Sequence, residues 1–231
     1  MFSHLFDPSV WSIVLLSLQV SFVAMLVSLP LAIIIGKILA GPGFIGKAFL
    51  SALVHLPLVL PPVVTGYALL VVFGRRGWIG SMLDQIGIGF TFSWVGAALA
   101  AGIMAFPLIV RPIRLAFESQ DYRLAEMAAT LGARRSRRFF KIALPLAYPG
   151  ILAGLVLGFA KALGEFGATI TFVSNIPGET QTLSLAIYTL LQSPRGDNAA
   201  LALITISIVL SFGAILASEW MTNSSQKKLE R

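Results

Sequence analysis

The sequence contains no cysteine, which excludes disulfide bonds, thiolate metal sites and a cysteine nucleophile. Charged residues are also scarce: they make up 12% of the 231 residues, whereas a soluble domain carries about 25%. The two histidines, His4 and His55, are far apart and form no metal-binding motif. We therefore expect no metal site, and the shortage of charge indicates a chain that lies largely in lipid.

Long apolar runs take up most of the sequence, and 57% of the residues are hydrophobic. A membrane-spanning helix needs about 20 largely apolar residues. The segments that qualify are residues 11–39, 48–73, 92–110, 145–167 and 199–220. The runs are continuous rather than alternating, so a β-barrel is rejected. The sequence predicts an all-α, polytopic membrane protein with five transmembrane helices, in which residues 1–231 form a single membrane domain.

The segment 181–191 (QTLSLAIYTLL) would be a sixth span. It has a helical pattern but is too short to cross a bilayer. A sixth span would also place the basic C-terminal tail outside, against the distribution of charge described next. We expect a short interfacial or re-entrant helix on the outer side.

The positive charges are distributed unevenly between the two sides of the five spans. Thirteen of the 17 Lys and Arg residues fall on one side, three fall on the other, and Lys161 lies within a span. The positive-inside rule then predicts that the N-terminus lies outside and the C-terminus inside. The basic stretch 111–141 lies in the cytoplasm. Because this charge adjoins apolar spans, the net charge of +7 is attributed to orientation in the lipid bilayer, and no nucleic-acid partner is expected.

Residues 41–48 (GPGFIGKA) match the G-x-x-x-x-G-K pattern of a phosphate-binding loop. Ala48 stands where that motif needs the Ser or Thr hydroxyl that binds magnesium. The segment also joins two membrane spans, whereas the motif needs a strand before it and a helix after it. We expect a tight cytoplasmic turn and no ATP binding by this chain alone.

A loop of about residues 118–144 separates the third and fourth spans. Asp121 can cap a helix, Gly132 suits its end, and Pro145 suits the first turn of the next helix. Apolar residues recur between these positions at helical spacing: Leu124, Met127, Ala128 and Leu131. Such an amphipathic helix either lies on lipid headgroups with its arginines on anionic lipid or docks a partner. Periodicity alone favours the lipid interpretation.

The spacing of residues in this loop resembles the E-A-A…G…I-x-L-P motif of permeases in binding-protein-dependent ABC importers. The matching residues are Glu126, Met127, Ala128, Gly132, Ile142, Leu144 and Pro145. Met127 is the one departure, because the family usually has Ala there. In that family the loop forms a coupling helix that seats in a groove of the ATPase subunit. The resemblance implies this docking role for Glu126 through Gly132, and a type I ABC importer permease fold.

The second span carries Pro57, Pro61 and Pro62, which cannot all sit in an undisturbed helix. The span is either a kinked packing helix or a bend that shapes the pathway or its gate, and both interpretations stay open. In the fourth span a row of small residues predicts close packing on another helix or on a second protomer. These residues are Gly150, Gly154 and Gly158.

Lys161 and Glu165 lie four residues apart on one helix face. A lone Lys near the bilayer centre costs roughly 2.5–3.5 kcal/mol, and pairing with Glu165 lowers that cost. The pair is either structural, or Lys161 offers positive potential to a passing anion while Glu165 holds it in place. The candidates for the pathway or gate are Pro61, Pro62, Lys161, Glu165, Phe166 and Thr169.

Residues 162–190, together with 56–64 and 74–80, closely resemble the molybdate importer permeases, and the segment 175–180 (NIPGET) resembles that branch most. Sulfate and thiosulfate permeases share the overall plan. The resemblance implies a homodimeric pore for molybdate or tungstate in a bacterial inner membrane, working by alternating access. The implied partners are two ATPase subunits, which hold ATP and magnesium, and a periplasmic molybdate-binding protein. This chain would be no enzyme and would hold no cofactor; a sulfate or thiosulfate permease is the alternative.

Two other classes of protein fit less well. An ion-coupled transporter or channel would show an inverted repeat or intramembrane acids for coupling, yet only Lys161 and Glu165 are available. A membrane-embedded enzyme would need a nucleophile, a metal cluster or an acid–base pair. Neither histidine has a suitable neighbour, and Glu165 is predicted to pair with Lys161.

Overall fold

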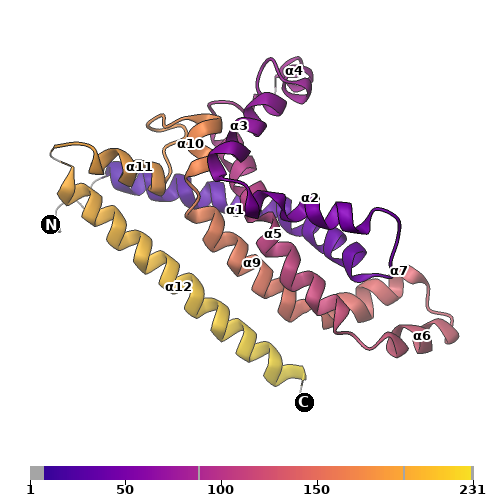
Figure 1. Ribbon diagram of the computed structural model, residues 1–231. Helices are drawn as coiled ribbons and strands as arrows, with labels where there is room; N and C mark the ends of the chain where they lie inside the picture. Colours follow the sequence, from indigo (N-terminus) through magenta and orange to yellow (C-terminus); the bar gives the residue numbers. More distant parts are fainter. Residues whose placement is uncertain (1–7, 88, 195, 230–231) are drawn as a thin grey trace.

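The computed structural model describes residues 8–87, 89–194 and 196–229, and these residues form helices and connecting turns without any strand. Three helices make up the core, with α5 (Trp94–Glu118) packed between α1 (Pro8–Ala40) and α9 (Tyr148–Leu163), as Figure 1 shows. The prediction of an all-α chain is confirmed. The third span is longer than the predicted 92–110, because the polar residues after Val110 end the apolar run but not the helix.

Small side chains allow the core helices to approach closely. The buried alanines of α5 are Ala97, Ala98, Ala100, Ala101 and Ala105. In lipid, where tails are as apolar as side chains, helices associate through close van der Waals packing of this kind. The α5 helix is accordingly the more buried of the two longest apolar helices.

The predicted row of small residues on α9 faces α5 of the same chain. A Cβ atom added at Gly154 would lie 2.8 Å from the carbonyl oxygen of Ile109, and one at Gly150 would collide with Ala116. Gly158 is similarly pressed against the Ile109 side chain. The packing partner left open by the sequence is therefore another helix of this chain.

Replacing Gly154 with leucine is expected to destabilise the permease, because the added side chain meets the α5 backbone, which cannot move aside cheaply. Overpacking of this kind costs about 2–3 kcal/mol, which lowers the thermal midpoint by about 6 °C in a chain of this size. Gly213→Leu on α12 is the matched control, since nothing lies within 4 Å of its Cβ position. Equal midpoints for the two purified variants would contradict the packing role.

The second predicted span, residues 48–73, is not one helix. It is divided into α2 (Lys47–Val59) and α3 (Pro62–Phe73), which meet at 116°. Leu60, which precedes a proline, is extended at φ −70° and ψ 144°, as the steric clash with a following proline favours. Pro62 then occupies the first turn of α3, where its missing N–H costs nothing. The prediction that the prolines disturb the helix is confirmed, and the second predicted span consists of two helices rather than one.

The fourth predicted span, residues 145–167, is also divided. The helices α7 (Arg135–Arg138), the π-helical η2 (Phe139–Ala143) and α8 (Leu144–Leu146) form one stretch that meets α9 at 65°. The sequence predicted that Pro145 begins the fourth spanning helix. It lies instead in this preceding stretch and not in α9. Pro149 occupies the first turn of α9 instead, and a second proline four residues after Pro145 explains why the sequence allowed either start.

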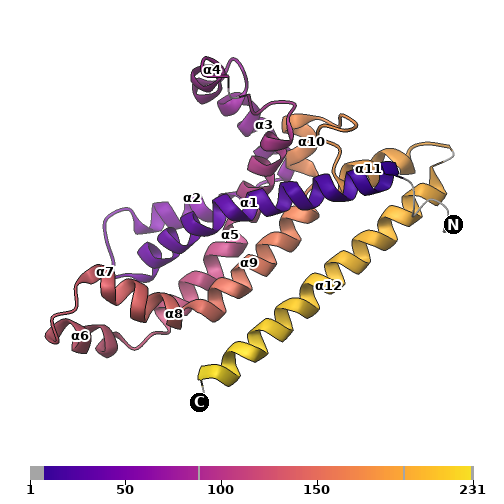
Figure 2. The ribbon, with the colours of Figure 1, turned by 180° about the vertical axis from the view of Figure 1, so that it is seen from behind.

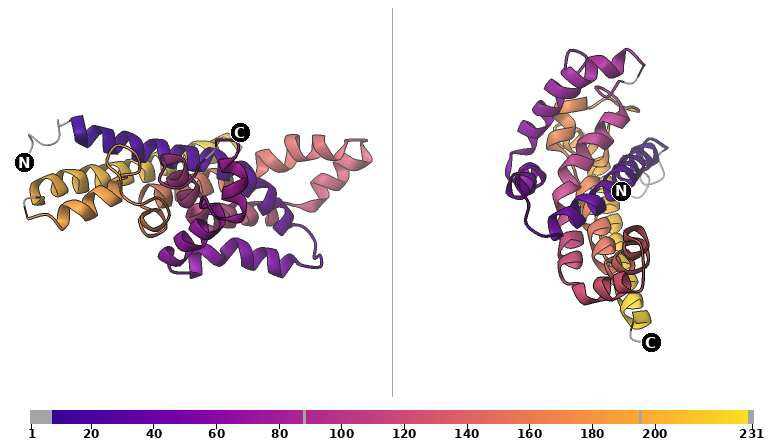
Figure 3. Two further views of the ribbon diagram at one scale, coloured as in Figure 1. Left: turned by 90° about the horizontal axis from the view of Figure 1, so that it is seen from above. Right: turned by 90° about the vertical axis from the view of Figure 1, so that its right-hand side faces the viewer.

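The remaining helices complete the two ends of the molecule. They are α4 (Trp78–Asp84), α6 (Tyr122–Thr130), α10 (Gly167–Val173), α11 (Leu183–Leu191) and α12 (Asp197–Leu229). Figures 1, 2 and 3 show α6 and α7 at one end, and α11 with the start of α1 at the other. The α12 helix runs back towards the α6 end. The short helix predicted over residues 181–191 is confirmed as α11.

Two helices of the described residues, Ser9–Ala40 and Trp94–Glu118, are long and apolar enough to cross a membrane, and each bent pair adds one if it counts as a single span. The part of α12 whose side chains the structure describes without a gap, Asp197–Gly213, is also apolar and spans 17 residues. The chain ends, whose sides of the membrane were predicted, lie outside the described residues. The start of α1 does lie at the end opposite α6, as the predicted topology requires (Figure 1).

Candidate functional site

The predicted docking loop contains a well-delimited helix, α6, at one end of the molecule (Figure 2). Asp121 caps its start, and the carboxylate Oδ1 accepts a hydrogen bond from the Arg123 N–H at 2.9 Å. At the other end Gly132 has φ +80°, a left-handed conformation that glycine adopts without strain. Both terminal residues do what the sequence predicted.

Backbone hydrogen bonds around Gly132 form a Schellman motif. The Ala133 N–H donates to the Ala128 carbonyl at 2.9 Å, and the Gly132 N–H donates to the Ala129 carbonyl at 3.0 Å. The carbonyl groups at the end of α6 are therefore satisfied within the loop. A helix of only nine residues is marginal on its own, so these caps hold α6 in shape.

The tip of α6 presents apolar side chains that are left uncovered by the part of the chain that the structure describes. Met127 is 64% exposed and Leu131 is 87% exposed. The Glu126 side chain is also exposed beside them. An apolar surface with an acidic neighbour suits contact with a partner protein, and on the predicted cytoplasmic side it lies where an ATPase would meet it.

The second half of the docking motif supports α6 from behind. Ile142, Leu144 and Pro145 lie on the helical stretch from α7 to α8 and not on α6 itself. Two hydrogen bonds tie this stretch to the loop: Arg138 Nη1 donates to the Ala125 carbonyl at 3.2 Å, and Gln120 Nε2 donates to the Ala143 carbonyl at 2.8 Å. The motif thus divides into an exposed surface and its support.

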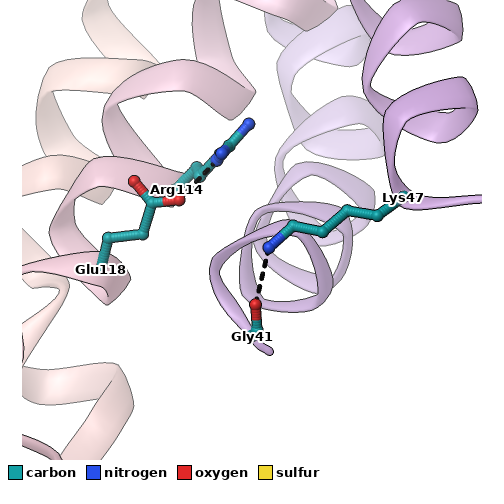
Figure 4. A network of polar contacts seen from close by, with 4 residues as sticks. All are labelled: Gly41, Lys47, Arg114 and Glu118. Carbon is teal, nitrogen blue, oxygen red and sulfur yellow. Dashed lines mark hydrogen bonds and ion pairs between the residues drawn. The ribbon is translucent and has the colours of Figure 1, made fainter. Parts of the chain in front are cut away.

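The segment that resembles a phosphate-binding loop forms the turn between α1 and α2. Its lysine, Lys47, donates from Nζ to the Gly41 carbonyl at 2.7 Å and closes the turn (Figure 4). Nearby, Arg114 and Glu118 form an ion pair at 2.7 Å across one turn of α5 (Figure 4). Arg114 and Arg111 therefore belong to α5, not to the loop in which the sequence placed them.

The candidate pathway residues gather where two helix breaks meet, one between α2 and α3 and the other between the end of α9 at Leu163 and the start of α10 at Gly167. The α2/α3 break brings Pro62 against Gly167 at the start of α10, where an added Cβ would lie 2.7 Å from the Pro62 Cβ atom. One turn further along α3, Gly66 packs as closely on the Ala168 backbone. Sequence reasoning missed Gly66 and Gly167; a glycine close to each break was the signal available.

The ion pair predicted between Lys161 and Glu165 is present, with 2.6 Å between Lys161 Nζ and Glu165 Oε2. Glu165 lies just beyond α9, which ends at Leu163, so the prediction that both residues lie on one helix face is wrong. The Glu165 side chain is 1% exposed, and that of Lys161 is 31% exposed. The other carboxylate oxygen, Oε1, accepts from the Ala168 N–H at 3.1 Å and caps the start of α10. Glu165 therefore joins the end of α9 to α10, while Lys161 is the partner with access to the surroundings.

Other polar and aromatic groups line the same region. The Phe166 ring lies 4.9 Å from the Tyr188 ring of α11, and Thr169 is buried. The Thr65 hydroxyl is buried with no hydrogen-bond partner in the described part of the chain. Tyr188 and Thr65 have no signal in the sequence, because their proximity depends on how α3, α10 and α11 fold back.

Comparison with known proteins identifies the family. A family model described as "Binding-protein-dependent transport system inner membrane component" matches residues 28–226. The chain belongs to this family. It is 57% identical over 226 residues, 97% of this chain and 98% of the other, to the molybdenum transport system permease protein ModB of Escherichia coli strain K12. The ModB of Haemophilus influenzae is 55% identical, over 93% of this chain and 94% of its own.

Solved structures show the same fold. A bacterial ABC transporter that imports the acidic polysaccharide alginate superimposes with a TM-score of 0.76 at 22% identity, covering 96% of this chain and 82% of that one. The predicted permease fold and the predicted resemblance to molybdate permeases are both confirmed. This permease is a transport component of the membrane rather than an enzyme. The roles of individual residues stay predictions.

Proposed function

We propose that this permease forms, as a homodimer, the pathway through which an ATP-driven importer carries molybdate across a bacterial inner membrane. The near full-length similarity to molybdenum transport permeases carries the proposal. Tungstate, a tetrahedral oxyanion of similar chemistry, would follow the same route. A periplasmic binding protein delivers the anion, and two ATPase subunits dock on the cytoplasmic side and hold ATP and magnesium.

The docking of the ATPase is assigned to α6. Its exposed Met127 and Leu131 provide an apolar contact, and both of its ends are capped within the loop. A capped helix of this kind can transmit a movement of the ATPase to the membrane helices, whereas a flexible loop would change shape instead. The stretch from α7 to α8 continues to α9 across the 65° bend. Movement of the ATPase pair would therefore reach α9 and drive the alternation between inward-facing and outward-facing states.

The anion pathway is assigned to the region where the two helix breaks meet. Lys161 supplies the positive charge there, and Glu165 offsets most of it at 2.6 Å. A nearly neutral pair attracts an anion weakly, which suits passage better than tight binding. Pro61, Pro62, Phe166 and Thr169 are proposed to shape the walls or the gate.

The test is ATP hydrolysis by the complete complex. The permease is reconstituted in liposomes with its ATPase and its periplasmic binding protein, and molybdate, tungstate and sulfate are compared. We expect molybdate and tungstate to stimulate hydrolysis and sulfate to leave it at the basal rate. Stimulation by sulfate alone would support the sulfate alternative, and failure of the ATPase to assemble with the permease would overturn the proposal.

A further inference from the structure

A cavity of about 900 Å³ lies behind α6, between the docking loop and the ends of α1 and α5. Its walls are partly apolar, with Phe117, Phe139, Ile142 and Leu146 among them. It lies on the predicted cytoplasmic side, where membrane helices end and the headgroup region begins. The proposed function makes no use of this cavity.

Three cations line the cavity: Lys37 from the last turn of α1, and Arg135 and Arg138 from α7. None of them has a carboxylate within ion-pair distance among residues 8–87, 89–194 and 196–229. Lys37 Nζ instead lies 4.8 Å from the centre of the Phe117 ring. Three positive charges therefore line this cavity without forming an ion pair among the described residues.

Arg138 also has an N–H group that lacks a hydrogen-bond acceptor. Its Nη1 donates to the Ala125 carbonyl at 3.2 Å, but its Nε is buried with no hydrogen-bond partner in the described part of the chain. A buried donor without an acceptor is costly. A guanidinium group is suited to an oxyanion, because it can donate charge-assisted hydrogen bonds to it.

The two carboxylates in the wall are already engaged. Glu118 is paired with Arg114 at 2.7 Å, and Asp121 Oδ1 accepts the hydrogen bond that caps α6. The cavity thus has a net positive wall with an apolar floor. That combination matches a phosphate group attached to an apolar body, as in a membrane lipid, and also admits the phosphate group alone.

We infer that this cavity binds a phosphate-type oxyanion through Lys37, Arg135 and Arg138, carried by an anionic lipid headgroup or free in the cytoplasm. The ligand would join the end of α1 to the base of the docking helix. Occupancy would then stiffen the loop through which the ATPase acts. The inference does not depend on which substrate the permease carries.

The experiment uses the full-length permease purified with its ATPase and stripped of endogenous lipid. Thermal midpoints are recorded while phosphatidylglycerol, phosphatidylcholine or inorganic phosphate is added. Lys37→Gln combined with Arg135→Gln removes two of the cations without breaking the Arg138 hydrogen bond to α6. Arg134→Gln combined with Arg137→Gln is the matched control, since both arginines are exposed and neither lines the cavity.

We expect phosphatidylglycerol to raise the thermal midpoint and phosphatidylcholine to leave it unchanged. The apparent affinity for phosphatidylglycerol should be weaker by at least about tenfold in the cavity variant. A response to inorganic phosphate that the cavity variant also loses identifies a free anion as the ligand. The inference is overturned if the control variant loses the response equally, or if the cavity variant responds as the wild type does. It is also overturned if the cavity variant loses only its affinity for the ATPase, because the cations would then be a protein contact. Equal midpoints in phosphatidylcholine show that the cavity variant is folded.

Discussion

Replacing Gly132 with proline is expected to abolish substrate-stimulated ATP hydrolysis while the permease still inserts into the membrane. Gly132 has φ +80°, and the proline ring holds φ near −65°. Proline also removes the N–H that donates to the Ala129 carbonyl at 3.0 Å. The end of α6 must then unwind, so Met127 and Leu131 lose their fixed positions. We expect substrate-stimulated hydrolysis to fall by at least about tenfold, because misplacing a group by about 1 Å can lower the rate of an enzyme by such a factor.

Gly87→Pro is the matched control for this experiment. Gly87 has φ +78°, donates its N–H to the Asp84 carbonyl at 3.1 Å, and has open space around its Cβ position. It follows α4, far from the docking loop. Glu126→Lys tests the same surface without changing the backbone, and is also expected to uncouple hydrolysis from substrate. Stimulation at the wild-type level in both Gly132→Pro and Glu126→Lys would reject the docking role of α6.

Replacing Lys161 with methionine is expected to destabilise the permease more than replacing Lys161 and Glu165 together. The single change leaves the buried Glu165 carboxylate with only the Ala168 N–H as a partner. Breaking a fully buried pair costs about 3–5 kcal/mol. About 2 kcal/mol is expected here, because 31% of the Lys161 side chain is exposed and solvent screens the charge.

The companion variant Lys161→Met with Glu165→Gln keeps an oxygen for the Ala168 N–H and removes both charges. Its thermal midpoint should lie above that of Lys161→Met by about 4 °C. Transport by the two variants then separates the two interpretations of the pair. If the double variant transports less molybdate than the single variant despite being more stable, the charge acts on the anion and the purely structural interpretation fails.

The sequence predicted most of the features that depend on residues close to one another along the chain. The apolar runs gave the helical membrane class, Asp121 and Gly132 gave the ends of α6, and the spacing of Lys161 and Glu165 gave their contact. Each of these depends on neighbours within about one helical turn. The two ends of α6 have nearly the same geometry in any fold that contains this helix, whereas the ion pair reaches across the end of α9.

The features that the sequence did not predict depend on contacts between distant segments. Hydropathy shows that residues 48–73 are apolar, but not that Leu60 turns the chain by 116°. Arg111 and Arg114 end an apolar run, yet α5 continues because arginine is a good helix former. The cavity behind α6 requires α1, α5 and α7 to converge, and no periodicity in one segment reports that.

The break between α2 and α3, where Pro62 packs on Gly167, affects how this part of the chain can contact lipid. The helices α2 and α3, of 13 and 12 residues, are each about 18–20 Å long, short of the ~30 Å of hydrocarbon. If the pair crosses the membrane as one bent span, the facing ends of the two helices lie inside the bilayer core. Backbone groups at such ends are tolerated only against protein or water, and the close packing of Gly167 on Pro62 supplies protein on one side of the break. In the proposed homodimer, the second copy or the water of the pathway would cover the other side of this break.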